Sequence, residues 1–118
     1  MVDGSRPGVV VHLDEADPAR QRLALANVAN LLADLGPAAG PVELVVNGPG
    51  LDVALQGSPL AGDLAALQGQ GVVVAACANT LAARGLERSA LLPGVHVVPA
   101  GVSELVRRQR EGWAYLRP

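Results

Sequence analysis

The chain has 118 residues, half of them hydrophobic and 17% charged, and its formal net charge at pH 7 is −2. This length suits one hydrophobic core, so we expect a single domain over residues 1–118. The weak negative charge, the absence of Phe and the presence of one Trp and one Tyr argue against nucleic-acid partners, which need a basic face or stacking aromatic side chains. All nine basic residues are Arg, so Schiff-base chemistry on a lysine is excluded.

The composition also argues against several metal-binding, cofactor-binding and membrane functions. A single cysteine excludes an internal disulfide and any zinc or iron–sulfur site built from the cysteines of one chain. The two histidines and eleven carboxylates are scattered without metal-ligand spacing, so we expect neither a metal nor a cofactor. The first seven residues do not resemble a signal peptide, and apolar runs such as residues 72–78 are too short to cross a bilayer. These features favour a cytoplasmic protein without a membrane partner.

The first two predicted elements are a buried strand and a long helix. Residues 9–13 form a mostly β-branched run, which is typical of a strand covered on both faces. Asp17 and Pro18 predict the start of a helix, because Asp accepts hydrogen bonds from free amides and Pro fits the first helical position. Gly36 is expected to end this helix. Its apolar residues recur at helical spacing and are Ala24, Leu25, Val28, Leu31, Leu32 and Leu35.

The middle of the chain predicts a second strand and two more helices. Residues 42–46 form the strand, and the tight loop Asn47-Gly48-Pro49-Gly50 follows it. A short helix is expected over residues 51–55. Ser58-Pro59 then predicts the start of another helix, because it combines a capping side chain with a proline. One apolar face of that helix carries Leu60, Leu64 and Leu67.

The last part of the chain predicts three strands, at residues 72–76, 95–98 and 113–116. Cys77 directly follows the first of these and opens a helical stretch that ends near Arg84. A further short helix is expected over residues 86–92. The final helix begins at Gly101, and its apolar face is predicted to carry Val102, Leu105, Val106 and Gln109.

Strands therefore alternate with helices along the whole chain. Right-handed crossovers then give a mostly parallel five-stranded sheet with helices on both faces, an α/β fold of the flavodoxin-like size class. In such folds ligands bind outside the carboxyl ends of the strands. Three loops are expected at that edge, at residues 14–18, 47–50 and 77–80, and they contain most of the candidate functional residues.

Cys77 is the strongest candidate for chemistry. It lies between a buried strand and the start of a helix, where backbone amides stabilise an anion and lower the pKa of a thiol. A thiolate or a persulfide would therefore be favoured at this position. The alternative is a structural cysteine, because a free cysteine is often buried as a small hydrophobic residue.

The other candidate residues each have a structural alternative. His12, near the end of the first strand, is either an acid, base or donor at the floor of the site or a hydrogen-bonded core histidine. Asn47 and Gly48 either present amides to an anion or form a rigid turn. Asn79 and Thr80 either orient a bound group or cap the helix after the cysteine.

Three further features are assigned structural or surface roles. We expect His96 to be structural. The cluster Arg107, Arg108 and Arg110 is interpreted as a solvated helix end, with binding of acidic partners as the alternative. Trp113 and Tyr115 are candidates for a contact surface, or else they pack against the core.

Taken together, the segments resemble the DsrE/DsrF-like sulfur-relay family, and its smaller YchN-like members more than the larger relay subunits. The order and spacing of the matching segments carry the resemblance, which covers nearly the whole chain. The matching segments are residues 10–14, 25–32, 45–51, 71–81, 98–102 and 109–118.

This resemblance implies a three-layer α/β/α sandwich with a five-stranded sheet, and assembly into trimers or hexamers. It also implies that sulfur is carried as a persulfide on a cysteine at the end of the third strand, which corresponds to Cys77. Asn79 and Thr80 correspond to the segment just after that cysteine, and Asn47 and Gly48 correspond to the loop beside it.

The leading hypothesis is therefore a small sulfur carrier. Cys77 would accept sulfane sulfur from a sulfurtransferase and pass it to an acceptor thiol, without a cofactor, and His12 would lie near the floor of the pocket. Whether such a carrier counts as an enzyme stays open. The alternatives are an oligomeric protein that binds a small anion or metabolite, and a structural subunit of a larger assembly, both with an unreactive Cys77.

Overall fold

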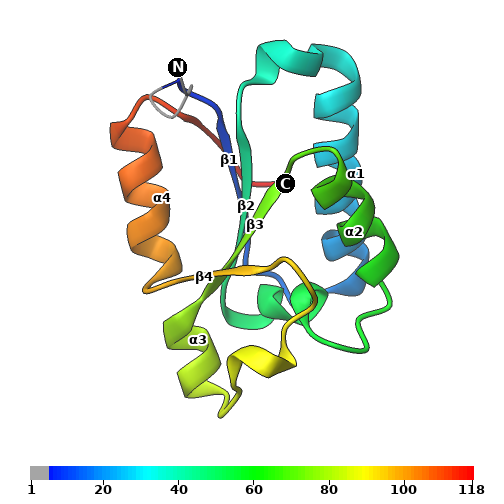
Figure 1. Cartoon of the computed structure of the whole chain (residues 1–118), viewed down its shortest axis with the longest axis vertical. Coiled ribbons are helices and arrows are strands. Elements are labelled where there is room, and N and C mark those ends of the chain that lie inside the picture. The colour runs from blue at the N-terminus through cyan, green and yellow to red at the C-terminus, as the bar shows by residue number, and fades with distance from the viewer. Residues whose placement is uncertain (1–5) are drawn as a thin grey trace.

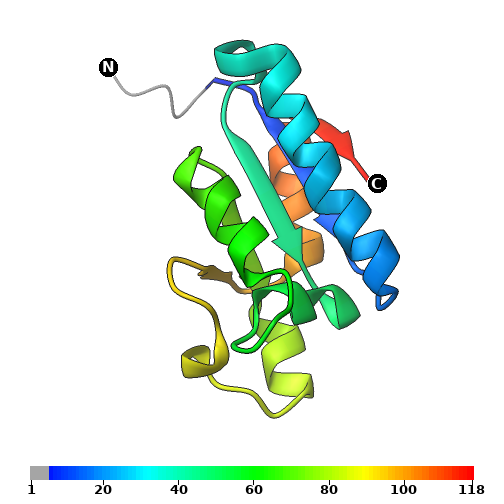
Figure 2. The same ribbon diagram turned by 90° about the vertical axis from the view of Figure 1, so that its right-hand side faces the viewer.

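A five-stranded parallel sheet forms the centre of the computed structural model, which describes residues 6–118 (Figures 1 and 2). The strands lie in the order β4-β3-β2-β1-β5, and every neighbouring pair is parallel. The fold predicted from the alternating pattern is therefore confirmed. The strands are β1 (Val9–Leu13), β2 (Val42–Val46), β3 (Val73–Cys77), β4 (His96–Val98) and β5 (Ala114–Leu116).

Helices cover both faces of the sheet. The long helix α1 (Pro18–Leu35) and the shorter α2 (Ala61–Gly69) lie side by side on one face, and α4 (Gly101–Arg110) lies on the other (Figure 1). The short helix α3 (Ala78–Ala83) continues directly from β3 beyond the carboxyl end of that strand. No helix in residues 6–118 is long and apolar enough to span a membrane.

The start of α1 agrees with the sequence pattern. The Asp17 side chain accepts a hydrogen bond from the Ala19 N–H at 3.0 Å, and Pro18 is the first helical residue. Ser58 makes the corresponding bond, since its hydroxyl accepts from the Leu60 N–H at 3.1 Å. That bond closes a turn, however, and α2 begins only at Ala61.

The two short helices expected over residues 51–55 and 86–92 are not α-helices. The structure has a 3-10 helix over Gly48–Ala54 and a single 3-10 turn over Arg88–Ala90. These segments pair with each other instead, through an antiparallel bridge between Leu55 and Leu91. Two backbone hydrogen bonds, Gln56 N–H to Ala90 and Leu92 N–H to Ala54, join the segments, so part of their backbone groups is satisfied outside their own helical turns.

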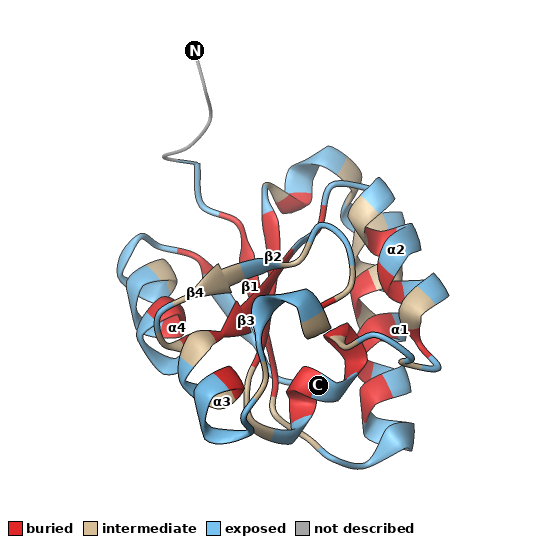
Figure 3. Ribbon diagram, turned by 60° about the horizontal axis from the view of Figure 1, so that its bottom comes forward, coloured by how far each residue is buried: buried red, intermediate tan, exposed pale blue. Residues whose placement is uncertain are grey.

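The face under α1 and α2 is an apolar core. Alternate strand residues point into it, and Val11, Leu44 and Val74 are all fully buried. Figure 3 shows the buried residues concentrated along β1, β2 and β3. Of the predicted α1 stripe only the first part is buried, and Leu35 is 43% exposed. The helix is 18 residues long, roughly 27 Å, whereas a five-residue strand spans only about 17 Å, so the helix extends past the sheet.

The α4 face is packed differently from the prediction. Leu105 is buried against Val10, Val45 and Ala75, as expected. Val102 and Val106, which were expected on the same buried face, are 61% and 46% exposed. The helix presents Glu104 to the sheet in their place, because β2 places Glu43, a carboxylic acid of only 4% exposure, on this face beside Val45.

Candidate functional site

Three chain segments meet at the carboxyl edge of the sheet. Cys77 is the last residue of β3 and caps the N-terminus of α3 with its backbone. Asn47 and Gly48 follow β2, the neighbouring strand. The first residue of α4, Gly101, lies against both, although it is 24 residues beyond the cysteine in the chain. The edge thus brings the cysteine and the predicted loop together.

The sulfur of Cys77 lies among hydrogen-bond donors. Its residue is only 6% exposed, and this burial raises the pKa of the thiol. That effect is outweighed by the Thr80 hydroxyl and by the backbone N–H groups of Gly101, Thr80 and Asn79, which lower the pKa of the thiol. The pKa of the Cys77 thiol is therefore lowered from its ordinary value, and the geometry favours an anionic sulfur.

Thr80 connects the cysteine with the loop after β2. Its hydroxyl oxygen accepts a hydrogen bond from the Gly48 N–H at 2.9 Å, and the same hydroxyl group lowers the pKa of the Cys77 thiol. The helix-capping interpretation of Asn79 and Thr80 is wrong. Both residues lie inside α3, and the N-cap residue is Cys77, which has no side-chain capping bond.

Gly101 lets α4 approach the site closely. A Cβ atom at this position would lie 3.1 Å from the Cβ of Asn47 and 3.4 Å from the Cβ of Cys77. Any larger residue would therefore push the N-terminus of α4 away from the sulfur. The sequence analysis placed Gly101 only as a turn before a helix and missed this role, because the close approach depends on a residue distant in the chain.

His12 is held by two hydrogen bonds. Its Nε2 lies 2.9 Å from Asn47 Oδ1, and its Nδ1 lies 2.8 Å from the Tyr115 hydroxyl. Because the Asn47 oxygen can only accept, Nε2 carries the proton of the neutral ring and Nδ1 accepts from Tyr115. The ring is 8% exposed, and the Asp14 carboxylate lies 3.7 Å from Nε2. His12 therefore contacts the site through Asn47, and its partner Tyr115 was not foreseen.

The remaining sequence candidates lie elsewhere. His96 is exposed at the edge strand β4. Arg108 is not a solvated helix end, since its guanidinium lies 3.0 Å from a Glu43 oxygen, 3.3 Å from a Glu104 oxygen and 4.4 Å from the centre of the Trp113 ring. Trp113 itself is buried in the core on the α4 face. Arg107 and Arg110 stay exposed.

A hollow of about 460 Å³ adjoins the cysteine site. Its walls are the loop after β2 and one side of α3, and Thr80 belongs both to this wall and to the surroundings of the sulfur. At one end the Arg84 guanidinium and the Asp52 carboxylate form an ion pair with an N–O distance of 2.7 Å. The lining residues are Gly48, Pro49, Asp52, Asn79, Thr80, Ala83 and Arg84.

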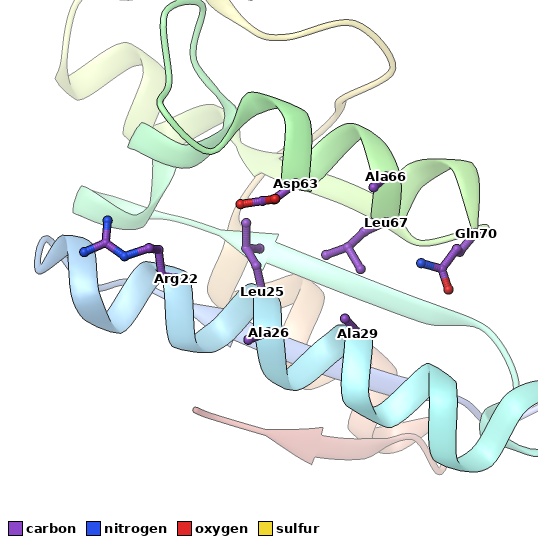
Figure 4. A pocket seen from close by; sticks show the side chains of 8 residues that line it. All are labelled: Arg22, Leu25, Ala26, Ala29, Asp63, Ala66, Leu67 and Gln70. Atoms are coloured by element: carbon purple, nitrogen blue, oxygen red, sulfur yellow. The ribbon is translucent and has the colours of Figure 1, made fainter.

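A second hollow, of about 380 Å³, lies between α1 and α2, on the face of the sheet away from α4 (Figure 4). Leu25 and Leu67 point into it, while Arg22 and Asp63 stand on its two walls. It contains no nucleophile and no histidine. Within residues 6–118 no group of three or more His, Cys, Asp or Glu side chains could hold a metal ion. The chemistry therefore concentrates at the carboxyl edge.

Together, fold and site define a class: an α/β/α sandwich with a parallel five-stranded sheet and one cysteine at the carboxyl end of its third strand. The sequence profile of the DsrE/DsrF-like family matches residues 8–118, and the chain belongs to this family. A solved structure with 47% sequence identity is that of MTH1491 from Methanobacterium thermoautotrophicum, a protein of unknown function. The match covers 95% of this chain and 99% of that one, with a TM-score of 0.90. The comparison with curated proteins gives no significant match.

Proposed function

We propose that this protein is a sulfur carrier that holds sulfane sulfur on Cys77 as a persulfide. The observation that carries this proposal is the position of Cys77 between the end of β3 and the start of α3 with Gly101 packed against it, where the Thr80 hydroxyl and three backbone N–H groups lower the pKa of its thiol. Such donors stabilise the thiolate, which is the nucleophile, and a persulfide anion in the same place. A cysteine that served only as a small core residue would gain nothing from them.

The transfer consists of two exchange steps. The Cys77 thiolate attacks the outer sulfur of a donor persulfide, a new S–S bond forms, and the donor leaves as its thiolate. An acceptor thiolate then attacks the outer sulfur on Cys77, and the Cys77 thiolate leaves. Neither step consumes an external oxidant or reductant, so no cofactor is needed. The donor is a sulfurtransferase loaded with sulfane sulfur, and the acceptor is a thiol.

Assembly and location form part of the proposal. Val102, Val106 and Leu116 are large apolar side chains that stay exposed on α4 and β5. Burying them between copies would favour a homo-oligomer, either a trimer or a hexamer. A free thiol that cycles through a persulfide also suits the reducing cytoplasm better than an oxidising compartment.

A second candidate is a binding or structural subunit in which Cys77 is inert. The observation in its favour is the 6% exposure of Cys77, which limits access to the sulfur. The two candidates differ in one property, the reactivity of the native thiol. A carrier must react with a sulfane-sulfur donor in the folded state, whereas an inert core cysteine reacts only after unfolding.

The deciding experiment is the intact mass of the folded protein after brief exposure to inorganic polysulfide. The expected result is a gain of one or more sulfur atoms that a reducing thiol reverses, and no gain for Cys77→Ser. Cys77→Ser is the matched control because it replaces only the sulfur atom. An unchanged mass in the wild type, together with slow alkylation of the native thiol, would contradict the carrier proposal and support the inert subunit.

A further inference from the structure

The hollow beside Cys77 combines a neutral wall with one pair of opposite charges. Pro49 and Ala83 contribute apolar surface, and the ion pair of Arg84 and Asp52 stands at one end. We infer that this hollow binds the α-amino-acid head group of a small thiol that takes sulfur from Cys77, with the carboxylate on Arg84 and the ammonium group on Asp52. The inference rests on the proposed function and names the class of its acceptor.

Charge complementarity supports this class of ligand. An α-amino acid carries a carboxylate and an ammonium group on one carbon atom, and the hollow offers one cation and one anion 2.7 Å apart. A thiol with only a negative or only a positive group would leave one of the two protein charges without a partner. The planar guanidinium of Arg84 also matches a carboxylate in a two-bond geometry.

The existing ion pair is easily exchanged for ligand contacts. The Arg84 and Asp52 side chains are 37% and 48% exposed, and pairs at such exposure contribute little to stability because water screens them. Both groups also belong to the lining of the hollow, so a ligand reaches them without a backbone movement. The volume of about 460 Å³ lies in the range of small-molecule sites and exceeds what a single water molecule needs.

The reacting sulfur lies within reach of such a ligand. Arg84 follows Cys77 by seven residues, which is about 10 Å along a helix. A helical side chain leans back toward the helix N-terminus, and Thr80, one turn earlier, lines the hollow together with Arg84. The Thr80 hydroxyl also lowers the pKa of the Cys77 thiol. The outer sulfur of a persulfide stands about 2 Å beyond Sγ, which extends the reacting atom beyond the cysteine side chain.

The transfer step balances without a further reactant. The thiolate of the bound ligand attacks the outer sulfur on Cys77, the new S–S bond belongs to the ligand, and Cys77 leaves as the thiolate that its four donors stabilise. The ligand departs as a small persulfide. The amino-acid head group takes no part in the bond changes and serves only to hold the thiol in place.

The test starts from protein loaded on Cys77 with polysulfide and follows the loss of sulfur by mass. L-cysteine carries both charges, cysteamine lacks the carboxylate, and N-acetylcysteine lacks the ammonium group. Each kcat/KM is divided by the value for the double variant Arg84→Gln/Asp52→Asn, which corrects for the different intrinsic reactivity of the three thiols. The expected corrected preference for L-cysteine over the other two is about tenfold or more, and it arises in KM.

Single variants show which protein charge causes the preference for L-cysteine over each of the other two thiols. Arg84→Gln is expected to remove the discrimination against cysteamine, and Asp52→Asn that against N-acetylcysteine, while kcat stays within about twofold. Arg110→Gln and Asp34→Asn make the same chemical changes at exposed positions outside the hollow and are the matched controls. Equal corrected rates for the three thiols, or a preference that survives in the variants, would overturn the inference. Failure of the proposed function is recognised separately, because the wild type would then never load.

Discussion

The two faces of the sheet are built from the same strands but differ in chemistry. Under α1 and α2 every inward strand residue is apolar, as with Val11, Leu44 and Val46. Under α4 the same strands present His12 and Glu43 beside apolar residues. Because successive residues of a strand point to opposite faces, one sheet can have an apolar face for stability and a polar face that extends to the site.

The polar face contains a buried pair of carboxylic acids. Burial, together with a hydrogen bond to Glu104, raises the pKa of Glu43 to about 7, although the nearby Arg108 acts in the opposite direction. Burial also raises the pKa of Glu104, but the hydrogen bond from Glu43 and the nearby Arg107 and Arg108 lower it overall. Below about pH 7 the proton of the pair therefore resides on Glu43, which donates it to the Glu104 carboxylate. This bond joins α4 to the sheet, and the N-terminus of α4 supplies one donor to Cys77.

Truncation of the apolar face is expected to have the largest effect on stability. Leu44→Ala removes a fully buried side chain and should lower the free energy of unfolding by about 3 kcal/mol. Val102→Ala is the control, because that side chain is 61% exposed and its loss should change stability by less than about 0.5 kcal/mol. Urea titrations measure both. Equal losses for the two variants would contradict the assignment of the core.

The carboxylic acid pair predicts a pH dependence that the apolar face lacks. The pKa of Glu43 in the folded protein lies above its ordinary value of 4.5, so the folded state binds more protons between pH 4.5 and about 7. The stability that Glu43 contributes is thus fully present below pH 4.5 and is lost as the pH rises through about 7. Glu104, whose pKa is lowered, acts oppositely, and its contribution is lost only as the pH falls below 4.5.

Between pH 5 and pH 8 the wild type should therefore lose on the order of 2 kcal/mol of unfolding free energy through Glu43. Glu43→Gln keeps a donor for Glu104 and removes the titration, so its stability should fall less over this range. Urea titrations at several pH values give the comparison, with fluorescence of the single Trp113 as the probe. Parallel pH profiles for the two proteins would show that Glu43 is not the titrating group.

Removal of the Thr80 hydroxyl tests the polar side of the comparison directly at the Cys77 site. Thr80→Val deletes one of the four donors to Cys77 and should raise the pKa of the thiol, because a thiolate then has fewer partners. The rate of alkylation by iodoacetamide at pH 7 should fall roughly three- to tenfold, and the midpoint of its pH profile should move up. Thr80→Ser keeps the hydroxyl and should react like the wild type. A T80V profile that coincides with the wild type would remove Thr80 from the site.

The smallest effect is expected at the edge strand β5. Tyr115→Phe removes the donor to His12 Nδ1 and should lower the unfolding free energy by about 1 kcal/mol. It should also weaken the preference for the Nε2–H tautomer, which nitrogen-15 NMR of the two histidines reports directly. The exposed His96 is the internal reference, because its signals should not change. A His12 tautomer that is unaffected by the variant would mean that Asn47 alone orients the ring.

Much of the fold follows from local sequence signals. The β-branched runs define the strands, and Asp17-Pro18 defines the start of α1, because these effects act over a few residues. The Ser58 signal was equally clear and still misplaced the start of α2. The short helices expected over residues 51–55 and 86–92 are 3-10 turns with other bounds, Gly48–Ala54 and Arg88–Ala90, because some of their backbone bonds join the two segments.

The candidate site was predictable only in part. Cys77 at the end of a strand, and Asn47 and Gly48 at the end of the neighbouring strand, could be placed at one edge from the order of the elements alone. Gly101 and Tyr115 could not, because their contacts with the site join residues 24 and 103 positions apart.

The sequence by itself therefore determined most of the element types, the parallel sheet and the position of the only cysteine, since periodicity and capping are local properties of the chain. Tertiary structure decided which face of α4 is buried and which donors surround the sulfur. Helical periodicity favoured Val102 and Val106 as the buried face, but the sheet offered Glu43, and a buried carboxylic acid requires polar partners. Helix α4 therefore presents Glu104 and Arg108 to the sheet, and in this orientation its first residue, Gly101, lies close to Cys77.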